Sequence, residues 1–549
     1  MKKTIIKFSM VSMVLVCMYS CSKKIDEAYA NPNAPVRVPV EQLLPQIISS
    51  MAANYSTPTP HGPLHDMRYI GAYVQNWQFS NTNSVFDQMG YTNSIGDIAQ
   101  STWRMHYFDI GQNNVKMIEW ATEEKKWDYA GVGQAIFAWS WLTLTDYYGD
   151  VILDEAFRTE LITFKYDTQD KVYDHVRYLC FQALENLNKT GDNVSAVNLA
   201  KGDAYFYNGD AQKWKKFVYG LLARYHNHLS NKSTYKSDSV IHYANLAMMS
   251  NADNAVVKFQ ASGFAANYSY FGPFRNQLIG TGSTNPTAIR QGAYIANLEN
   301  GTNSEFLGAA DPRAWYMLRG NTNGTIIGVL PNKGQTALAS GDRSENFWGT
   351  SQATSVNNTG VNANARFIFR DDSPIPVMTA SEMKFLIAEA AFRKNDKATA
   401  LQAYKDGISL HFDMLTSVYS FGIPAGKEIT TTNKAAYMNN PLVVPLLAAD
   451  LTMTKIMLQK YIAMFGYGIL ETWVDMRRFH YSDSYGGLPV YRDFIVPTGG
   501  DLFPDNNGLT VQRMRPRFNS EYVWNINELI RIGATANDYH TKEMWFSKP

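Results

Sequence analysis

Thr379 to His411 read TASEMKFLIAEAAFRKNDKATALQAYKDGISLH, and this stretch decides the fold. Thr379 and Glu382 predict an N-terminal capping box, in which each side chain satisfies the other residue's free backbone N–H. Alanine-rich apolar residues follow at helical spacing on both sides of a tight Asn395-Asp396 turn. Small residues at helix crossings, a short turn and an aromatic partner are typical of a tetratricopeptide hairpin.

Such a hairpin cannot bury its apolar face alone, so several should stack into one scaffold. Further helical pairs are predicted near residues 131–190, 211–250 and 450–479. The second of these is the clearest, because Asp210 can cap a helix whose apolar residues recur at three- and four-residue spacing. Together with residues 379–411, these segments predict a mainly α protein, a tetratricopeptide-like helical-repeat scaffold of about four helix pairs.

Long irregular stretches separate the helical pairs, above all residues 251–378. They hold clusters of Asn, Gly, Thr and Ser with scattered aromatic residues and few helical periods. Loops of this length in a compact protein are usually functional or carry small local strands. Residues 40–549 are therefore predicted to form a single domain, in which long loop-rich inserts decorate one side of the helical scaffold.

Residues 1–20 have the features of a lipoprotein signal peptide. Three lysines flank the start of an apolar run from Phe8 to Val16, which is too short to cross a bilayer and matches a secretory h-region. Ser20 precedes Cys21 as in a bacterial lipobox, so we expect cleavage before Cys21 and lipidation of its thiol. Residues 21–39 then form a polar tether. The alternative is an ordinary secretory signal that is cleaved elsewhere, with Cys21 incidental.

The charge balance argues against a nucleic-acid-binding protein, and the cysteine content argues against a protein stabilised by disulfides. Removal of residues 1–20 lowers the count of basic side chains from 50 to 47, against 49 acidic ones. A phosphate-binding surface needs a basic excess, so no nucleic acid is expected as a partner. Cys180 would remain as the free thiol, which excludes an intramolecular disulfide. Because Cys180 lies on an apolar helical stripe, a buried structural thiol is favoured over a nucleophile.

A search for catalytic and metal-binding motifs finds little. There is no G-x-S-x-G, P-loop, H-E-x-x-H or C-x-x-C pattern. Gly62 and Pro63 interrupt the helix that would align His61 with His65, so no metal site is predicted there. The loop from Asp501 to Gly508 offers oxygen ligands for calcium but lacks the spacing of a known calcium loop, and an ordinary turn is favoured. No cofactor is expected.

Four carboxylates cluster in sequence, at Asp146, Asp150, Asp154 and Glu155. A glycosidase needs two acids at the right separation, so these residues leave a surface polysaccharide hydrolase open as an alternative. The segment from Asp146 to Asp150 is, however, typical of a helix end followed by a turn. A structural role is therefore favoured for its carboxylates.

Several motifs, in order along most of the chain, support a resemblance to one family. They are Asn31-Pro32-Asn33 with Val38-Pro39 and Leu43-Leu44, Ala135 to Phe157, Gly209-Asp210 to Leu229, Asp311-Pro312-Arg313, Ser381-Glu382 through Ala391, Gln459 through Trp473, Arg477-Arg478, and Arg515-Pro516-Arg517-Phe518 with Glu521 and Asn525. On these residues the chain resembles the SusD/RagB family of Bacteroidetes outer-membrane nutrient-binding lipoproteins, in its SusD-like branch. One departure is Phe518-Asn519, which stands where the family has an aromatic-proline pair.

The resemblance implies a cell-surface protein, anchored in outer-membrane lipid through Cys21, that acts as a hinged lid over a SusC-like TonB-dependent barrel. The barrel and its inner-membrane partners supply the energy for import, so the lid is not expected to be an enzyme. Its cargo is an oligosaccharide or a peptide, and we expect a glycan. A structural or adhesive tetratricopeptide protein without a small ligand is a further alternative.

Sugars stack their apolar C–H faces on exposed aromatic rings, and amide side chains read their hydroxyl groups. The segments Tyr73 to Asn81, Trp103 to Tyr107 and Asn267 to Phe271 mix rings with polar groups. The predicted ligand-binding residues are therefore Tyr73, Trp77, Phe79, Trp103, Tyr268 and Tyr270. The alternative for each ring is the core, where large aromatic residues are more common. Four tryptophans within patterned helices are assigned to the core: Trp139, Trp141, Trp214 and Trp473.

Overall fold

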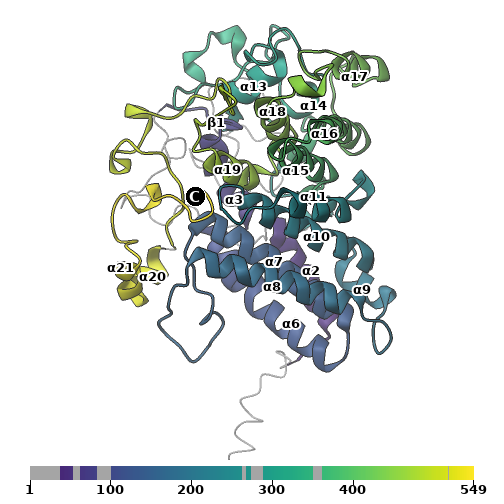
Figure 1. Ribbon diagram of the computed structural model, residues 1–549, viewed down its shortest axis with the longest axis vertical. Helices are drawn as coiled ribbons and strands as arrows, with labels where there is room; N and C mark the ends of the chain where they lie inside the picture. Colours follow the sequence, from purple (N-terminus) through teal and green to yellow (C-terminus); the bar gives the residue numbers. More distant parts are fainter. Residues whose placement is uncertain are drawn as a thin grey trace, which may run out of the picture.

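In the computed structural model of the protein, the stretch that decides the fold forms two helices, α15 (Ala380–Arg393) and α16 (Lys397–Val418), packed against each other (Figure 1). Asn395 has a φ of 65°, which lets the chain reverse between them. The Asp396 side chain then accepts a hydrogen bond from the backbone N–H three residues further on, at 3.1 Å, and caps α16. The predicted hairpin and its turn are confirmed.

The structure describes residues 37–52, 62–82, 100–262, 267–273, 289–349, 362–516 and 518–549. The predicted signal peptide, Cys21 and most of the predicted tether lie outside these residues. Within the described ranges, no helix combines the length and the apolar character needed to cross a membrane.

The start of α15 shows one difference from the prediction. Thr379 caps the helix by accepting a hydrogen bond from Glu382 N at 3.2 Å, as expected. The reciprocal half of the capping box is wrong, because the Glu382 side chain pairs with Arg224 of α10 (Ala211–His228). A buried guanidinium needs a carboxylate partner more than an N-terminal N–H needs a second acceptor.

Two other predicted pairs are present: α7 (Trp127–Tyr148) packs on α8 (Gln169–Asn188), and α10 packs on α11 (Ser237–Leu246). The fourth pair has both of its helices, α18 (Met453–Ala463) and α19 (Ile469–Arg478). These two pack mainly on other elements: α18 on α15 and α16, and α19 on α3, α7 and α10. The fold is thus the predicted helical-repeat scaffold, and the fourth pair joins its two ends.

The remaining elements are shorter or less regular in sequence. The helices are α2 (Val40–Ala52), α3 (Pro63–Tyr73), α5 (Ser101–Arg104), the π-helix η1 (Met105–Gly111), α6 (Gln112–Glu123), α9 (Ala196–Asp203), α13 (Ala293–Asn300), α14 (Ala314–Met317), α17 (Thr431–Met438), α20 (Phe518–Trp524) and α21 (Ile526–Arg531). The strands are β1 (Trp77–Phe79), β2 (Ala255–Val257), β3 (Ile289–Gln291), β4 (Ile375–Met378), β5 (Ser484–Tyr485) and β6 (Leu488–Pro489). Because α2 packs on α6 and α9, the N-terminal helix completes the scaffold.

The predicted insert, residues 251–378, is tied down by two antiparallel ribbons. β2 pairs with β4, so the two ends of the insert lie side by side. β3 pairs with β1, with Trp77 opposite Gln291, and this ribbon fastens the middle of the insert to the N-terminal part of the chain. The small local strands expected in these long loops therefore exist, and they fix the loops to the scaffold.

The core predictions from the helical patterns are confirmed. Cys180 is fully buried, and burial raises the pKa of its thiol, as expected for a structural cysteine. The four tryptophans assigned to patterned helices are buried as well. Trp214 also donates a hydrogen bond from Nε1 to Asp203 at 2.9 Å, which satisfies the indole N–H inside the core.

Candidate functional site

All six aromatic residues that the sequence analysis proposed as ligand platforms are buried, with no more than 8% of any side chain exposed: Tyr73, Trp77, Phe79, Trp103, Tyr268 and Tyr270. A ring that stacks on a sugar must offer one face to the ligand. Of the six, Trp103 lines the cavity that is described below.

Trp77 shows why the mixture of rings and amides wrongly predicted an exposed ligand platform. Its Nε1 donates to the carbonyl oxygen of Arg68 at 3.0 Å, and its ring meets three phenylalanine rings edge-on, with centroids 5.9 to 6.4 Å away. Every residue of β1 is buried, so both faces of the strand lie inside the protein. The alternation of rings and amides along it therefore does not mark one face as exposed to solvent. The structure thus places Trp77, and Phe79 two residues on, in the core.

The tyrosines of the proposed set hold the insert and the C-terminal segment in place. Tyr73 Oη accepts a hydrogen bond from Val511 N at 2.9 Å. Tyr270 Oη lies 2.9 Å from His65 Nδ1, and Tyr268 is buried close by in sequence. The hydroxyl groups of Tyr73 and Tyr270 are engaged within the protein and all three rings are buried, so the expectation of open platforms at Tyr73, Tyr268 and Tyr270 is not met.

Trp103 lies at the edge of a cavity of about 270 Å³ whose wall is largely aromatic. Tyr107, Phe157 and Phe164 are half-buried and line this aromatic cavity. Its other lining residues are Gln112, Ile152, Ala156, Arg158, Thr159, Leu161 and Glu521. Ligand pockets typically measure about 300–1,000 Å³, so the space suits a small ligand or one unit of a longer one.

The π-helix η1 supplies one wall of the aromatic cavity. Its wider turn presents Tyr107, whose Oη donates to the carbonyl oxygen of Ile152 at 2.8 Å and accepts from Ile152 N at 3.0 Å. Gly111 ends the π-helix against Phe157, where a Cβ would lie 2.5 Å from the ring. π-helical turns are rare and often occur at functional sites, which singles out this wall.

The opposite wall is a loop, residues 149–168, that the C-terminal helices hold. Asn525 brackets Phe164: its Oδ1 accepts from Phe164 N at 3.0 Å and its Nδ2 donates to the carbonyl oxygen at 2.8 Å. Glu521 accepts hydrogen bonds from Tyr166 Oη and Asn525 Nδ2, each at 2.9 Å. Glu521 and Asn525 belong to the C-terminal sequence motif, so this motif positions the cavity wall.

Polar groups reach the aromatic cavity at a few points. Gln112 Nε2 donates to the carbonyl oxygen of Phe157 at 3.1 Å and leaves its amide oxygen for other contacts. The Arg158 side chain is half exposed and pairs with Glu160 at 2.9 Å. Ring faces with a few amide and guanidinium groups suit a ligand that has apolar faces and hydroxyl groups.

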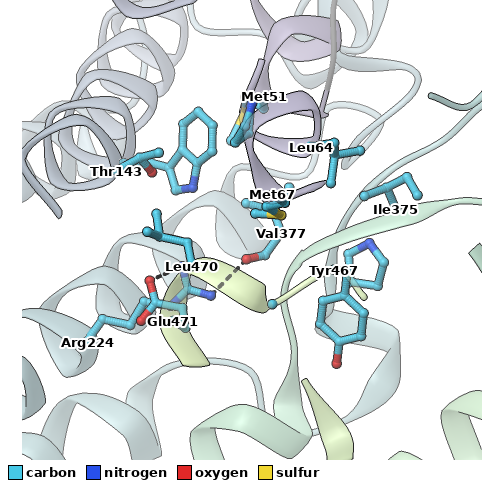
Figure 2. A pocket seen from close by; sticks show the side chains of 14 residues that line it. Met51, Leu64, Met67, Thr143, Arg224, Ile375, Val377, Tyr467, Leu470 and Glu471 are labelled. Carbon is cyan, nitrogen blue, oxygen red and sulfur yellow. Dashed lines mark hydrogen bonds and ion pairs between the residues drawn. The ribbon is translucent and has the colours of Figure 1, made fainter. Parts of the chain in front are cut away.

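A second cavity, shown in Figure 2, lies deep between the N-terminal segment, α7, α10 and α19. It holds about 40 Å³, enough for water but not for a sugar. Arg224 points into it, donating to the carbonyl oxygen of Val377 at 2.8 Å and lying 3.4 Å from Glu471. The site is therefore part of the interior and not a ligand pocket.

Beside this small cavity, Asp146, His228 and Glu471 bring their ligand atoms within 4.8 Å of one another. Tyr173 donates to Asp146 at 2.6 Å, and His228 Nε2 lies 2.9 Å from Glu471. Burial raises the pKa of Asp146 to about 6. These contacts make the group a hydrogen-bonded junction of four helices, α7, α8, α10 and α19, which fits the structural role favoured for Asp146.

The structure does not bring the four clustered carboxylates together round a cavity. Asp154 is exposed and pairs with Lys171, and Glu155 accepts from Lys165 N at 2.7 Å. Glu521 is the one carboxylate among the residues that line the aromatic cavity. A pair of acids of the kind that a glycosidase uses is thus not found there.

The other candidate ligand positions are occupied by ordinary contacts. His65 Nε2 lies 2.6 Å from Arg68 Nη2, and His61 lies outside the described residues. In the loop considered for calcium, Asp501 pairs with Lys333 at 3.3 Å and Asn506 Oδ1 lies 2.6 Å from His540 Nε2. The turn favoured for this loop is what the structure has.

Sequence reasoning named Trp103 but missed Phe157, Phe164 and Gln112. Two features of the sequence could have indicated further lining residues. Tyr107 ends the segment that begins at Trp103, and Phe157 ends the longest N-terminal family motif. No local pattern marks Phe164 as a lining residue, because its position depends on Asn525, more than 300 residues away in the chain. Contacts of that range cannot be read from local patterns.

The sequence pattern of the SusD-like family, described as "Starch-binding associating with outer membrane", matches residues 32–486. No curated protein matches the chain. Among solved structures, a SusD/RagB family protein from Bacteroides thetaiotaomicron is 21% identical, with a TM-score of 0.64 over 93% of this chain and 99% of its own.

Two further structures have the same fold. One is described as a chitin-binding protein and is 19% identical, with a TM-score of 0.65 over 93% of this chain and 99% of its own. The other is a SusD homologue from Bacteroides fragilis, 19% identical, with a TM-score of 0.64 over 93% of this chain and all of its own (100%).

Proposed function

The chain belongs to the SusD-like family, and on that premise we propose that it is a surface-exposed lipoprotein that captures a nutrient glycan. The family's proteins are associated with the outer membrane and bind nutrients. The description of the family names starch, and that of one protein with the same fold names chitin, so glycans are the first class of cargo to test.

The observation that carries the glycan proposal is the aromatic cavity between η1 and the 149–168 loop. Half-buried rings of Tyr107, Phe157 and Phe164 offer faces for the C–H surface of a sugar. The amide of Gln112 and the guanidinium of Arg158 lie in the same lining and can read hydroxyl groups. Both walls are held by hydrogen bonds, so little ordering is needed on binding.

Isothermal titration of the mature protein with chito- and malto-oligosaccharides, and separately with a peptide panel, tests this proposal. Phe164→Ala removes one ring while the backbone stays fixed by Asn525, and should weaken glycan binding about tenfold. Phe421→Ala is the control, because that ring is half exposed and does not line the cavity. Heat with peptides and none with any sugar would establish the peptide alternative.

The proposed partner is a SusC-like TonB-dependent barrel, over which the protein acts as a lid. This part rests on family resemblance. Purification from native membranes through a tag on this chain should recover such a barrel in stable association. Recovery of the tagged protein without any barrel would rule out the lid.

The proposed anchor is the lipidated Cys21, followed by the tether. The end of the tether is docked, since Arg37 pairs with Glu123 and Glu124 of the α6 region at 2.7 Å each. Cys21→Ser should abolish incorporation of labelled palmitate and release the protein from membranes, whereas Cys180→Ala, the matched control, should leave both unchanged. Membrane retention of the Cys21 variant would contradict the anchor.

A further inference from the structure

A third cavity, of about 330 Å³, opens between the start of α10, the β2–β4 ribbon and the C-terminal turn of α16. It shares no lining residue with the aromatic cavity. In Figure 1, α10 and α16 lie on the side of the molecule opposite α20 and α21. Any ligand of this cavity would therefore be bound independently of the aromatic cavity.

One part of this third cavity is apolar and rigid. Phe206 is buried and stacks on Trp214, with ring centroids 4.8 Å apart and planes at 26°. Met414 of α16 is buried as well, and the more exposed Pro374 and Val418 supply the accessible apolar surface. Tyr419 donates from Oη to the carbonyl oxygen of Pro374 at 2.8 Å. An apolar surface on a rigid support can accept the C–H face of a sugar ring.

The charge at this cavity has one sign. Its lining includes Lys213 and Lys258 and no carboxylate. Across the described residues, neither ammonium group has an acidic partner within 4.0 Å, whereas the neighbouring Lys216 pairs with Asp253 at 2.7 Å. Two unpaired cations beside an apolar surface attract an anion and orient it.

Two acids beside these lysines, Asp203 and Asp210, are already engaged. Asp203 is buried and accepts hydrogen bonds from Trp214 Nε1 and Gly209 N; burial raises its pKa, and Lys258 lowers it in smaller measure. Asp210 uses one oxygen to cap α10, accepting from Gln212 N and Lys213 N. Neither carboxylate lines the cavity, so both leave the lysines available to a ligand.

We infer that this third cavity is a binding site for an anionic sugar residue, with the ring on Pro374 and Val418 and the acidic group between Lys213 and Lys258. A uronate carboxylate and a sugar sulfate share this chemistry. The inference does not rest on the proposed glycan site, because none of its residues line the aromatic cavity.

Titration calorimetry with trigalacturonate and with its methyl ester, at low salt, tests the inference. The two ligands have the same chain and differ in charge, so the acid should bind at least tenfold more tightly. A sulfated disaccharide, set against its unsulfated form, tells whether sulfate serves as well as carboxylate. Equal binding of charged and neutral forms in both pairs, or no binding of either anion, would overturn the inference.

Two variants assign the binding to this cavity. The double substitution Lys213→Glu with Lys258→Glu should weaken the anion at least tenfold, and Val418→Trp should do so by filling the cavity mouth. The control, Lys201→Glu with Lys215→Glu, makes the same change in net charge outside the lining. An equal loss in the control, or full binding by the lysine variant, would refute the assignment. Phe164→Ala should leave anion binding unchanged whatever it does to neutral glycans.

Discussion

Arg224 and Glu382 form a bidentate ion pair between two helical hairpins, with Nε 2.6 Å from Oε1 and Nη2 2.8 Å from Oε2. Both side chains are buried, and Arg224 also lies 3.4 Å from Glu471 of α19. One guanidinium thus connects α10, α15 and α19. The scaffold depends on such junctions because its helices come from distant parts of the chain.

Arg224→Met should therefore destabilise the protein by about 3–5 kcal/mol, because Glu382 would stay buried without its cation. Urea unfolding followed by circular dichroism measures the change. Lys116→Met is the matched control, since Lys116 pairs with Glu119 on the surface, where an ion pair contributes less than about 1 kcal/mol. Similar losses of unfolding free energy in the two variants would show that the Arg224 junction stabilises the protein no more than a surface ion pair does.

His106 makes the stability of the η1 wall depend on pH. Burial against Trp141 lowers the pKa of His106 to about 3, well below that of an unfolded histidine. The neutral imidazole is favoured in the folded state, so its contribution is fully present above about pH 6.5 and falls as the pH drops toward 3.

The unfolding free energy of wild type should thus decrease more steeply between pH 6.5 and 4 than that of His106→Gln. The comparison must be made between variant and wild type, because Asp66 and Asp146 act in the opposite sense. Burial raises the pKa of each to about 6, so their contribution falls as the pH rises from about 4 to 6. Parallel pH profiles would contradict the role given to His106.

Gly111→Ala should close the aromatic cavity from within. The new methyl group would lie 2.5 Å from the Phe157 ring, which must move into the space that a ligand would fill. Glycan affinity should fall at least tenfold while the melting temperature changes by a few degrees. Gly500→Ala is the control, as its Cβ would meet nothing within 4 Å. Unchanged affinity in Gly111→Ala would remove this cavity as the glycan site.

Trp77→Ala separates a core role from a binding role. With the indole in the core, the substitution should cost about 3–5 kcal/mol of stability, yet the folded fraction should bind glycan as wild type does. Trp524→Ala, at an exposed ring, should change stability little. A loss of affinity in Trp77→Ala, without a loss of stability, would restore Trp77 as a ligand platform.

The fold was predictable because its signals are local. Helical periodicity, the cap at Thr379 and the Asn395 turn each act within a few residues, and the structure has them. The family motifs also have a physical basis: Glu389 of one motif pairs with Arg478 of another at 2.8 Å inside the core. They therefore mark the scaffold more than the ligand site. α2 was missed because Pro45 lies inside it, a residue that usually argues against a helix.

The site was less predictable because burial is a property of the whole molecule. Nothing in the residues around Trp77 tells whether β1 has a solvent side, which depends on β3 more than 200 residues later. In the same way, the half-buried state of Phe164 follows from Asn525. Of the predicted rings, Trp103 lines the cavity that we propose as the glycan site.

The hold of Glu521 and Asn525 on the 149–168 loop sets an order of assembly. These residues leave the ribosome after every helix of the repeat scaffold. The helical body can therefore form first, and the aromatic cavity acquires its second wall only when the C-terminal helices dock. A chain cut short before Glu521 would have the helices of the scaffold but lack the contacts that hold the 149–168 loop against the aromatic cavity.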